Sequence, residues 1–291
     1  MDQVRRLSAV QEHRVLAAEP EIDIDELTAL AALVCDAPIA AATLIGDEQQ
    51  WYLSTFGTSM DALPGDAAFW GDSFLEGNAL VVRDTATDPR YAGNPHVLGG
   101  PGIRFFAATP LSTLTGIPIG AVCVCDREPR ALSARQLDAL RAVSRQISAQ
   151  LALRTRAAVL HANAQWLLEV FRTCPVALAV HRLSDGTFVD VNAAFTALLG
   201  WSREEVLGHT ALELRLAEDA VARKMQALLD QSGNHHEELA VTTRSGEARH
   251  VLAGAALMDI RGEPHVVTTF TDLTNRTRAE ERTGAGQDIH A

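Results

Sequence analysis

Apolar and polar residues alternate first with helical and then with strand periods along the first part of the chain. Residues 7–18 have a polar helical pattern, and apolar residues recur at helical spacing through 27–34 until Pro38. Strand-like runs cover 39–45 and 51–56, with a turn-rich segment between them. The pattern therefore predicts two helices followed by a β-hairpin.

The pattern continues with a helical patch near 67–76 and a short strand at 79–82. A long segment rich in Asp, Pro, Gly and Asn occupies 83–102, and two strands follow at 105–114 and 117–125. Loops of that length inside a compact domain are usually lids or binding loops. We therefore expect a functional loop between the short strand and the two longer ones.

The second half of the chain contains a strand, a turn and two capped helices in one short run. Residues 188–191 are strand-like, and Asn192 is placed to cap a helix at 193–199 that a glycine closes. Ser202 and Glu205 form the capping-box pattern of a second short helix. Three further strand patterns follow, at 237–243, 248–257 and 265–271.

Between these halves, apolar residues repeat with a 3,4 spacing that changes phase once. The first run contains Leu137, Leu140, Ser144, Ile147 and Leu151, and the second contains Leu153, Arg156, Leu160, Asn163, Leu167 and Val170. Each run holds the pattern for about two heptads, fewer than a coiled coil needs on its own. We favour a dimeric signalling helix, with polar Ser144, Arg156 and Asn163 making it adjustable. The alternative is a helix whose two halves pack on the two flanking sheets.

Composition and charge narrow the class of protein. The 291 residues are enough for about two domains. A net charge of −12 without a clustered basic face argues against a nucleic-acid partner. The apolar runs are too short to cross a membrane, and the polar N-terminus lacks a secretory signal pattern, so we expect a cytoplasmic protein.

Three ordered motifs in the first half carry a family resemblance. They are VCDAPIAAATLIGDEQQWYLSTFG, VVRDTATDPRYAGNPHVLGGPGIRFFAATPL and GIPIGAVCVCDREPRALSARQ. Together they resemble a GAF domain of the kind that heads bacterial sensor proteins. The resemblance covers about 5–150.

The second half resembles a PAS sensor domain over about 166–275. The resemblance is carried by DGTFVDVNAAFTALLGWSREEVLG and by Asp272-Leu273-Thr274, which matches the closing Asp-Ile-Thr motif of that family. Both resemblances imply sensory modules of the kind found in the sensor halves of histidine kinases and diguanylate cyclases. The signatures of hydrolases, phosphate-binding loops, zinc proteases and kinases are missing from the sequence, so we expect no catalytic activity unless the chain belongs to a longer enzyme.

In a GAF domain a small molecule would lie between the sheet and the loop and helix above it. The candidate lining residues are Trp51, Phe69, Trp70, Asp84, Asp88, Arg90 and Arg104. Each also has a structural interpretation: the aspartates as caps of turns, the arginines as their counter-ions, and the aromatics as core.

In the PAS domain the candidate pocket residues are Phe195, Leu199, Trp201, Val251 and Val267, which are equally candidates for ordinary core. No cofactor is required by the sequence. A flavin photosensor of the light-oxygen-voltage type would need a Cys in an Asn-Cys-Arg-Phe run after the second short helix. This chain has His209-Thr210-Ala211-Leu212-Glu213 there, which argues against flavin photochemistry. Haem remains an alternative because imidazole ligates haem iron and six histidines fall in this half, namely His181, His209, His235, His236, His250 and His265.

A second alternative is a small redox enzyme of the GAF fold that uses Cys123 and Cys125. These thiols are two residues apart and so share one face of a strand. An apolar strand more often buries cysteine as an inert residue.

The sequence thus predicts an α+β protein with two domains, each a central antiparallel sheet with flanking helices, joined by a long helix. The expected domains are 1–150 (GAF-like, its last helix at about 133–162 running on as the connector) and 163–275 (PAS-like), with a polar tail at 276–291. The expected function is sensing of a small ligand or partner, with the signal passed by rearrangement of a helix or homodimer to a separate kinase or cyclase.

Overall fold

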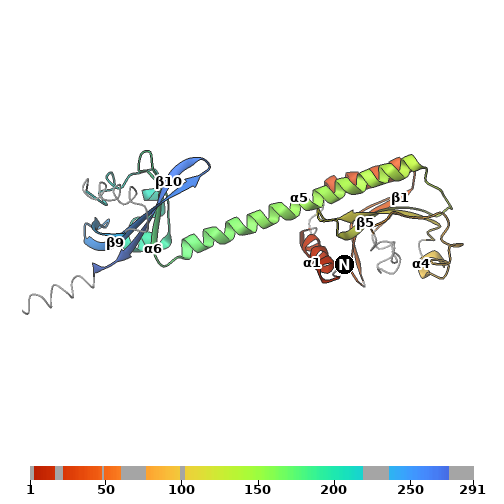
Figure 1. Ribbon diagram of the computed structural model, residues 1–291, viewed down its shortest axis with the longest axis horizontal. Coiled ribbons are helices and arrows are strands. Elements are labelled where there is room, and N and C mark those ends of the chain that lie inside the picture. The colour runs from red at the N-terminus through yellow and green to blue at the C-terminus, as the bar shows by residue number, and fades with distance from the viewer. Residues whose placement is uncertain are drawn as a thin grey trace, which may run out of the picture. The chain divides into compact units, whose positions relative to one another are not determined.

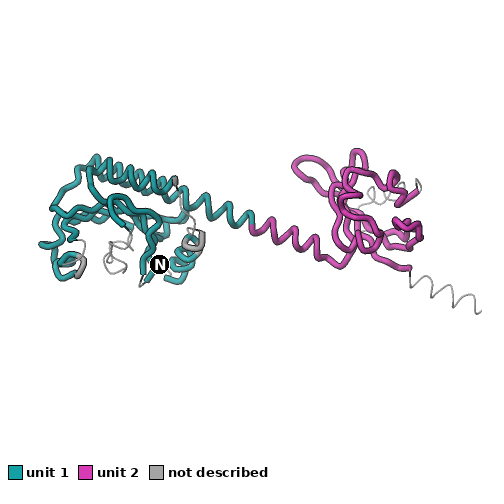
Figure 2. Tube along the Cα trace, turned by 180° about the vertical axis from the view of Figure 1, so that it is seen from behind, with its two compact units in different colours: residues 1–161 teal, residues 162–291 magenta. Residues whose placement is uncertain are grey.

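A computed structural model describes residues 3–16, 22–47, 49–59, 77–98, 102–218 and 236–274. The chain divides into two compact units, 1–161 and 162–291 (Figures 1 and 2). Several predicted features lie outside the described residues: the helical patch at 67–76 with Phe69 and Trp70, His235, and the tail at 276–291. None of the described helices combines the length and the apolar composition that a bilayer crossing needs.

Unit 1 is a five-stranded antiparallel sheet with helices. Its helices are α1 (Gln3–Leu16), α2 (Ile22–Cys35), α4 (Pro95–Leu98) and the first part of α5 (Ala134–Thr173). Its strands are β1 (Ile39–Ile45), β2 (Gln50–Phe56), β3 (Leu80–Val82), β4 (Phe105–Ser112) and β5 (Pro118–Asp126), in the order β2-β1-β5-β4-β3. The predicted hairpin and the two longer strands are confirmed, within a few residues at their ends.

Both faces of the unit 1 sheet are covered, and every residue of β1 and β5 is buried. One face packs against α1, α2 and α5, and the other forms a second core with Tyr91 and Val97 from the segment after β3. The two central strands approach closely at Gly120, where an added Cβ would lie 2.0 Å from the carbonyl oxygen of Thr43. Only glycine fits there.

Unit 2 repeats the strand order of unit 1 with its own elements. Its strands are β6 (Ala177–Arg182), β7 (Phe188–Val191), β8 (His236–Thr242), β9 (Ala248–Ile260) and β10 (Glu263–Asp272), in the order β7-β6-β10-β9-β8. Its short helices are α6 (Ala193–Leu199) and α7 (Arg203–Val206). Strand β6 was not among the predicted strands, because its nearly continuous apolar run lacks a clear period-2 signal.

The predicted helix caps of unit 2 are confirmed. The Asn192 side chain accepts a hydrogen bond from the Phe195 amide at 3.0 Å, and Gly200 closes α6 in the left-handed conformation with φ of 79°. Ser202 and Glu205 make the reciprocal bonds of a capping box at α7. Asn192 also fixes the start of β6, because its Oδ1 accepts from the Leu178 amide at 2.9 Å.

Helix α5 has 40 residues and is longer than the predicted connector at 133–162. The sequence of α5 is rich in Ala, Leu, Arg and Gln, which favour helix. The helix ends at Thr173, two residues before Pro175. Its first part is held in unit 1 by Leu140, Ile147 and Leu151, which belong to the core beneath it. The predicted α+β fold, with two antiparallel sheets joined by a long helix, is confirmed.

Candidate ligand-binding site

Unit 2 contains a cavity of about 290 Å³ between its sheet and its short helices. Strands β6, β7, β8 and β10, helix α6 and the turn at 211–217 contribute to its wall. Most of the lining is apolar, with Phe188, Phe195, Leu239 and Phe270 among its members. Protein interiors are normally close-packed, so an apolar hollow of this size is a candidate binding site.

Aromatic rings line one wall of the cavity as a connected series. Phe188 and Phe195 lie 5.8 Å apart between ring centroids with an interplanar angle of 61°, and Phe195 and Phe270 lie 5.9 Å apart at 63°. His181 continues the series, 5.3 Å from Phe188. These are edge-to-face arrangements, which fix each ring against the next.

Besides Arg182 at the end of β6, the described sheet residues contribute one pair of polar side chains to the cavity. Thr268 Oγ1 lies 2.7 Å from His181 Nε2, at the point where β6 pairs with β10. Burial lowers the pKa of His181 to about 4, so the imidazole is neutral near pH 7. The cavity therefore offers hydrogen bonding without charge at this point.

The charge at the cavity edge is internally compensated. Arg182 Nη1 donates to Asp185 Oδ2 at 2.7 Å and to Thr187 Oγ1 at 3.1 Å. Hydrogen bonds from the hydroxyl and the amide of Thr187, with a further contribution from Arg182, lower the pKa of Asp185 to about 2. Arg182 thus already has a carboxylate partner.

Two of the five predicted PAS pocket residues line the cavity, and three do not. Phe195 and Leu199 line the cavity, and Val251 belongs to the same core without lining it. Trp201 is half-buried and stacks against the Arg244 guanidinium, 5.6 Å from its ring centroid. Val267 lies on the opposite face of β10, because its neighbours Val266 and Thr268 face the cavity.

Sequence reasoning missed several of the residues that matter most in this cavity. His181 was considered only as a haem ligand, and Phe188, Thr268 and Phe270 were not considered as lining. The alternation of Val266, Thr268 and Phe270 along one strand was the signal that could have found them.

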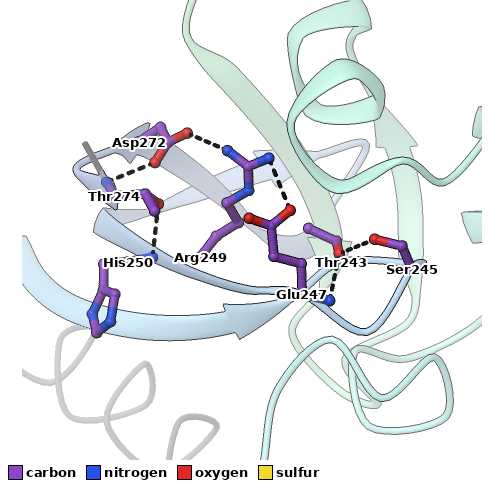
Figure 3. A network of polar contacts seen from close by, with 7 residues as sticks. All are labelled: Thr243, Ser245, Glu247, Arg249, His250, Asp272 and Thr274. Carbon is purple, nitrogen blue, oxygen red and sulfur yellow. Dashed lines mark hydrogen bonds and ion pairs between the residues drawn. The ribbon is translucent and has the colours of Figure 1, made fainter. Parts of the chain in front are cut away.

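A polar network fixes the end of β10 to β9 (Figure 3). Arg249 lies 3.2 Å from Asp272 and 3.2 Å from Glu247. Thr274 Oγ1 accepts from the His250 amide at 3.1 Å, and the Thr274 amide donates to Asp272 at 2.8 Å. Phe270 of the cavity wall is only two residues before Asp272, so one strand carries both features.

The Asp272 carboxylate is stabilised by this network. Burial raises its pKa, but the hydrogen bonds from Thr274 and the charge of Arg249 outweigh that effect and bring the pKa below its ordinary value. The turn before β9 adds a contact between the hydroxyls of Thr243 and Ser245 at 2.9 Å (Figure 3). The network therefore stabilises the segment through which the chain leaves the sheet.

In unit 1 the predicted pocket charges pair with one another. Arg104 donates to both Asp84 oxygens at 2.7 Å, and Arg90 donates to Asp88 at 3.0 and 2.7 Å. The hydrogen bond from Arg104 is the main cause that lowers the pKa of Asp84. Asp84 also accepts from the Ala86 amide at 3.1 Å, which is the turn-capping geometry of the structural interpretation.

Of the aromatic candidates of unit 1, Trp51 lies in the described part of the chain, whereas Phe69 and Trp70 lie outside it. Trp51 packs against the core beneath α1, α2 and α5, whereas Tyr91, which the sequence analysis did not select, belongs to the other core and lies under Arg90 at 5.3 Å. A second hollow of about 560 Å³, more polar and more open, lies beside α5, with Asn78, Arg141 and Arg145 in its lining.

The thiols proposed for redox chemistry are buried in unit 1. Cys123 and Cys125 lie on β5 within the second core. The contact with Cys123 and burial both raise the pKa of Cys125, and burial raises the pKa of Cys35 to about 11. A raised pKa keeps a thiol protonated and unreactive near pH 7.

Metal and haem ligation have few candidates in the described part of the chain. Within that part, no group of three or more His, Cys, Asp or Glu side chains is arranged to hold a metal ion. Of the five PAS histidines it includes, His181 is the one that lines the cavity. His265 is buried but bonds the Glu263 carbonyl through Nδ1 at 2.8 Å.

Comparison with known proteins agrees with the two units. The GAF domain model matches residues 19–151 and the PAS fold model matches residues 169–273. A cyclic di-GMP phosphodiesterase of Pseudomonas aeruginosa is 33% identical over 129 residues, which is 44% of this chain. The chain spans 22% of the length of that relative.

Two solved structures are similar to this chain to different extents. The DhaR(N)-DhaL complex of E. coli matches with a TM-score of 0.52 at 15% identity, over 91% of this chain and 87% of that chain, which is a likeness of fold. The PAS domain of an HTR-like protein from Haloarcula marismortui is 26% identical, covering 40% of this chain and 97% of that chain, with a TM-score of 0.36. The chain is therefore a sensory protein of the GAF–PAS type, with a GAF domain followed by a PAS domain.

Proposed function

We propose that this protein senses a small molecule that binds in the PAS cavity and passes the signal on by rearranging a helical dimer. The observation that carries the proposal is the cavity itself, an apolar hollow that contains one neutral hydrogen-bonding pair. A ligand there contacts Phe270 of β10, and β10 ends in the Arg249–Asp272–Thr274 network. The ligand would shift the equilibrium between two conformations of the protein toward the one that it binds more tightly.

The exposed part of α5 supports a homodimer. Leu153, Leu160 and Leu167 recur every seven residues and are 61%, 69% and 59% exposed, although they are large and apolar. A seven-residue apolar repeat on a helix surface is suited to a partner helix. The alternative, in which this part of α5 packs on the PAS sheet, receives no support because none of these leucines belongs to the PAS core.

The GAF domain is proposed as a second module for a ligand or partner, with Trp51, Phe69, Trp70 and the Asp84–Arg104 and Asp88–Arg90 pairs as its candidate residues. The proposal assigns no catalytic step to this chain. The output would belong to a separate cytoplasmic protein, such as a histidine kinase or cyclase, or to a longer protein that contains this chain. The phosphodiesterase relative adds cyclic di-GMP turnover as a candidate output.

The dimer is tested by charge substitution on the exposed stripe. We expect Leu160→Glu combined with Leu167→Glu to raise the dimer dissociation constant at least about 100-fold, because each carboxylate would be buried without a partner. Ala162→Glu, on the opposite side of the helix, is the matched control and should leave the constant unchanged. Sedimentation equilibrium of the full chain measures all three. A wild-type chain that stays monomeric at high concentration would refute the dimer.

Ligand binding is tested on freshly purified full-length chain by native mass spectrometry and an absorbance spectrum. A co-purified small molecule that is lost on mild unfolding supports the proposal. A Soret band would instead support the haem alternative, with His181 as the first ligand to substitute. A chain that carries no ligand, binds none and changes no partner activity would refute the sensory proposal.

A further inference from the structure

Resting on the proposed function, the cavity also restricts what kind of ligand it takes. We infer that the PAS cavity binds a neutral aromatic molecule of one or two fused rings that carries a single hydroxyl group. The inference comes from three properties of the wall: its charge, its remaining hydrogen-bonding capacity and its size.

Among the described lining residues, no side chain offers a free charge to an ionised ligand. Arg182 is the one formally charged side chain among the described lining residues, and its guanidinium already bonds Asp185 and Thr187. Asp185 adds a negative charge at the same edge. A carboxylate or phosphate entering the cavity would lose its hydration without gaining a free counter-ion, which disfavours anions. A cation would likewise lose its hydration, because the Asp185 carboxylate at this edge is already paired with Arg182.

The His181–Thr268 pair leaves capacity for one more polar group. The pair is joined through Nε2 and Oγ1, and no hydrogen bond to His181 Nδ1 is found within the described residues. A threonine hydroxyl has one proton and two lone pairs, so Thr268 also retains an acceptor or donor position. A ligand hydroxyl can both donate and accept, and it therefore suits the pair whichever tautomer His181 adopts.

The size and the ring geometry favour an aromatic body. The volume of about 290 Å³ is at the lower end of the range for small-molecule pockets, which suits one or two fused rings. Phe188, Phe195 and Phe270 stand edge-to-face at 61° and 63°, and a flat ring can continue that series. Of the candidates, an aromatic alcohol satisfies all three properties of the wall.

The test compares three probes with the same rings: naphthalene, a naphthol and the matching naphthoate. We expect the full chain to bind the naphthol about 5-fold more tightly than naphthalene, because one hydrogen bond is gained. The naphthoate should bind at least about 10-fold more weakly than the naphthol, because its charge is desolvated. Isothermal titration calorimetry, or competition by ligand-observed NMR, gives the three constants.

Two variants assign the preference to the cavity. Thr268→Val keeps the side-chain shape and should remove most of the naphthol preference, whereas Thr269→Val, the same change on the opposite face of β10, should retain it. Ala211→Phe adds a ring at the cavity wall and should weaken binding of all three probes. Because Ala211 is only half-buried, this variant is expected to fold.

The outcomes separate this inference from the proposed function. If the naphthoate binds as tightly as the naphthol and Ala211→Phe abolishes both, the ligand class is wrong while the cavity stands as a binding site. If none of the probes binds, the ligand class is overturned, and the search for a co-purified molecule decides separately whether the sensory proposal survives. A naphthol preference that persists in Thr268→Val would also overturn the assignment to the His181–Thr268 pair.

Discussion

The two sheets have the same strand order but differ in how their faces are covered. In unit 1 the central strands β1 and β5 are buried along their whole length, with a core on each face. In unit 2 the central strands β6 and β10 contain half-buried residues between buried ones, and both ends of β10 are exposed. One core, on one face of this sheet, is found among the described residues. Leu178, Val180 and Val267 on the other face are only half-buried.

Because of this difference, we expect the unit 1 sheet to be the more rigid and the unit 2 sheet to be the more adaptable. A strand packed on both faces tolerates little change, because each side chain has neighbours on every side. The PAS sheet retains a cavity on its covered face and a partly open second face, so its strands can adjust to an occupant. The following predictions test whether the two sheets really differ in this way.

The largest contrast is expected from adding one methyl group to a central glycine of each sheet. In Gly120→Ala the Cβ meets the Thr43 carbonyl oxygen at 2.0 Å, and the backbone has to move. In Gly254→Ala the nearest atoms are side-chain atoms of Thr269 at 2.9 Å and His236 at 3.0 Å, which can rotate. We expect losses in the free energy of unfolding of more than about 3 kcal/mol for the first and about 1 kcal/mol for the second.

Urea unfolding combined with hydrogen exchange of peptides from β5 and β10 locates each loss in its own unit. Equal effects of the two substitutions would show that the PAS sheet is as tightly constrained as the GAF sheet. That result would remove the basis for treating unit 2 as the adaptable domain.

The next largest effect is a loss of stability at low pH, and it is confined to unit 2. The pKa of His181 is about 4 in the folded chain and about 6.5 when unfolded. As pH falls below 6.5 the unfolded chain takes up a proton that the folded chain does not, so stability is present above pH 6.5 and is lost toward pH 4. We expect unit 2 to be about 2 kcal/mol less stable at pH 5 than at pH 7.

The matched variant is His181→Phe, which keeps a ring beside Phe188 but cannot titrate. Urea unfolding at the two pH values should show the pH-dependent loss shrinking by most of that amount in this variant. An unchanged pH dependence would mean that other groups carry it and that His181 is accessible to protons when folded.

Much of the fold could be predicted from local sequence signals, because those signals act within a few residues. Asn192, Gly200 and the Ser202–Glu205 box determine their helix ends through contacts with adjacent turns. Strand β1 was predicted at its observed bounds for the same reason, since an apolar run between turn residues defines its own ends.

The candidate site was harder to predict because it depends on which faces meet in three dimensions. His181 and Thr268 are far apart in sequence and become neighbours only through the register of β6 with β10. The same register turns Val267 away from the cavity. In unit 1 the sequence is compatible with two roles for Asp84 and Arg104, and only the bidentate geometry shows that they bind each other.

A smaller loss of stability is expected from a substitution at the end of β10. Asp272→Asn removes the charge that Arg249 pairs with and keeps the side-chain shape. We expect a loss of about 1 to 2 kcal/mol in unit 2, with faster hydrogen exchange at the Leu273 amide, which bonds the His250 carbonyl at 2.7 Å. Arg244→Gln, which affects a separate ion pair with Glu205 in the same unit, is the control and should leave that amide unchanged.

The smallest loss of stability is expected from substitution of a buried thiol in unit 1. This prediction tests whether the thiols belong to a structural core or to a redox site. Cys125→Ala removes one buried sulfur and should lower the free energy of unfolding by no more than about 1 kcal/mol, with probe binding in the PAS cavity unchanged. In the native chain Cys174, which is half-exposed, should be labelled by a thiol reagent before the buried Cys35, Cys123 and Cys125.

The labelling order matters because a redox enzyme needs an accessible thiolate, and both burial and the contact with Cys123 hold the Cys125 thiol protonated. If Cys123 or Cys125 were labelled as quickly as Cys174, the β5 strand would have to open readily. The GAF sheet would then be the more dynamic of the two, which is the reverse of what its double coverage predicts. Reductase turnover that disappears in Cys125→Ala would support the redox alternative directly.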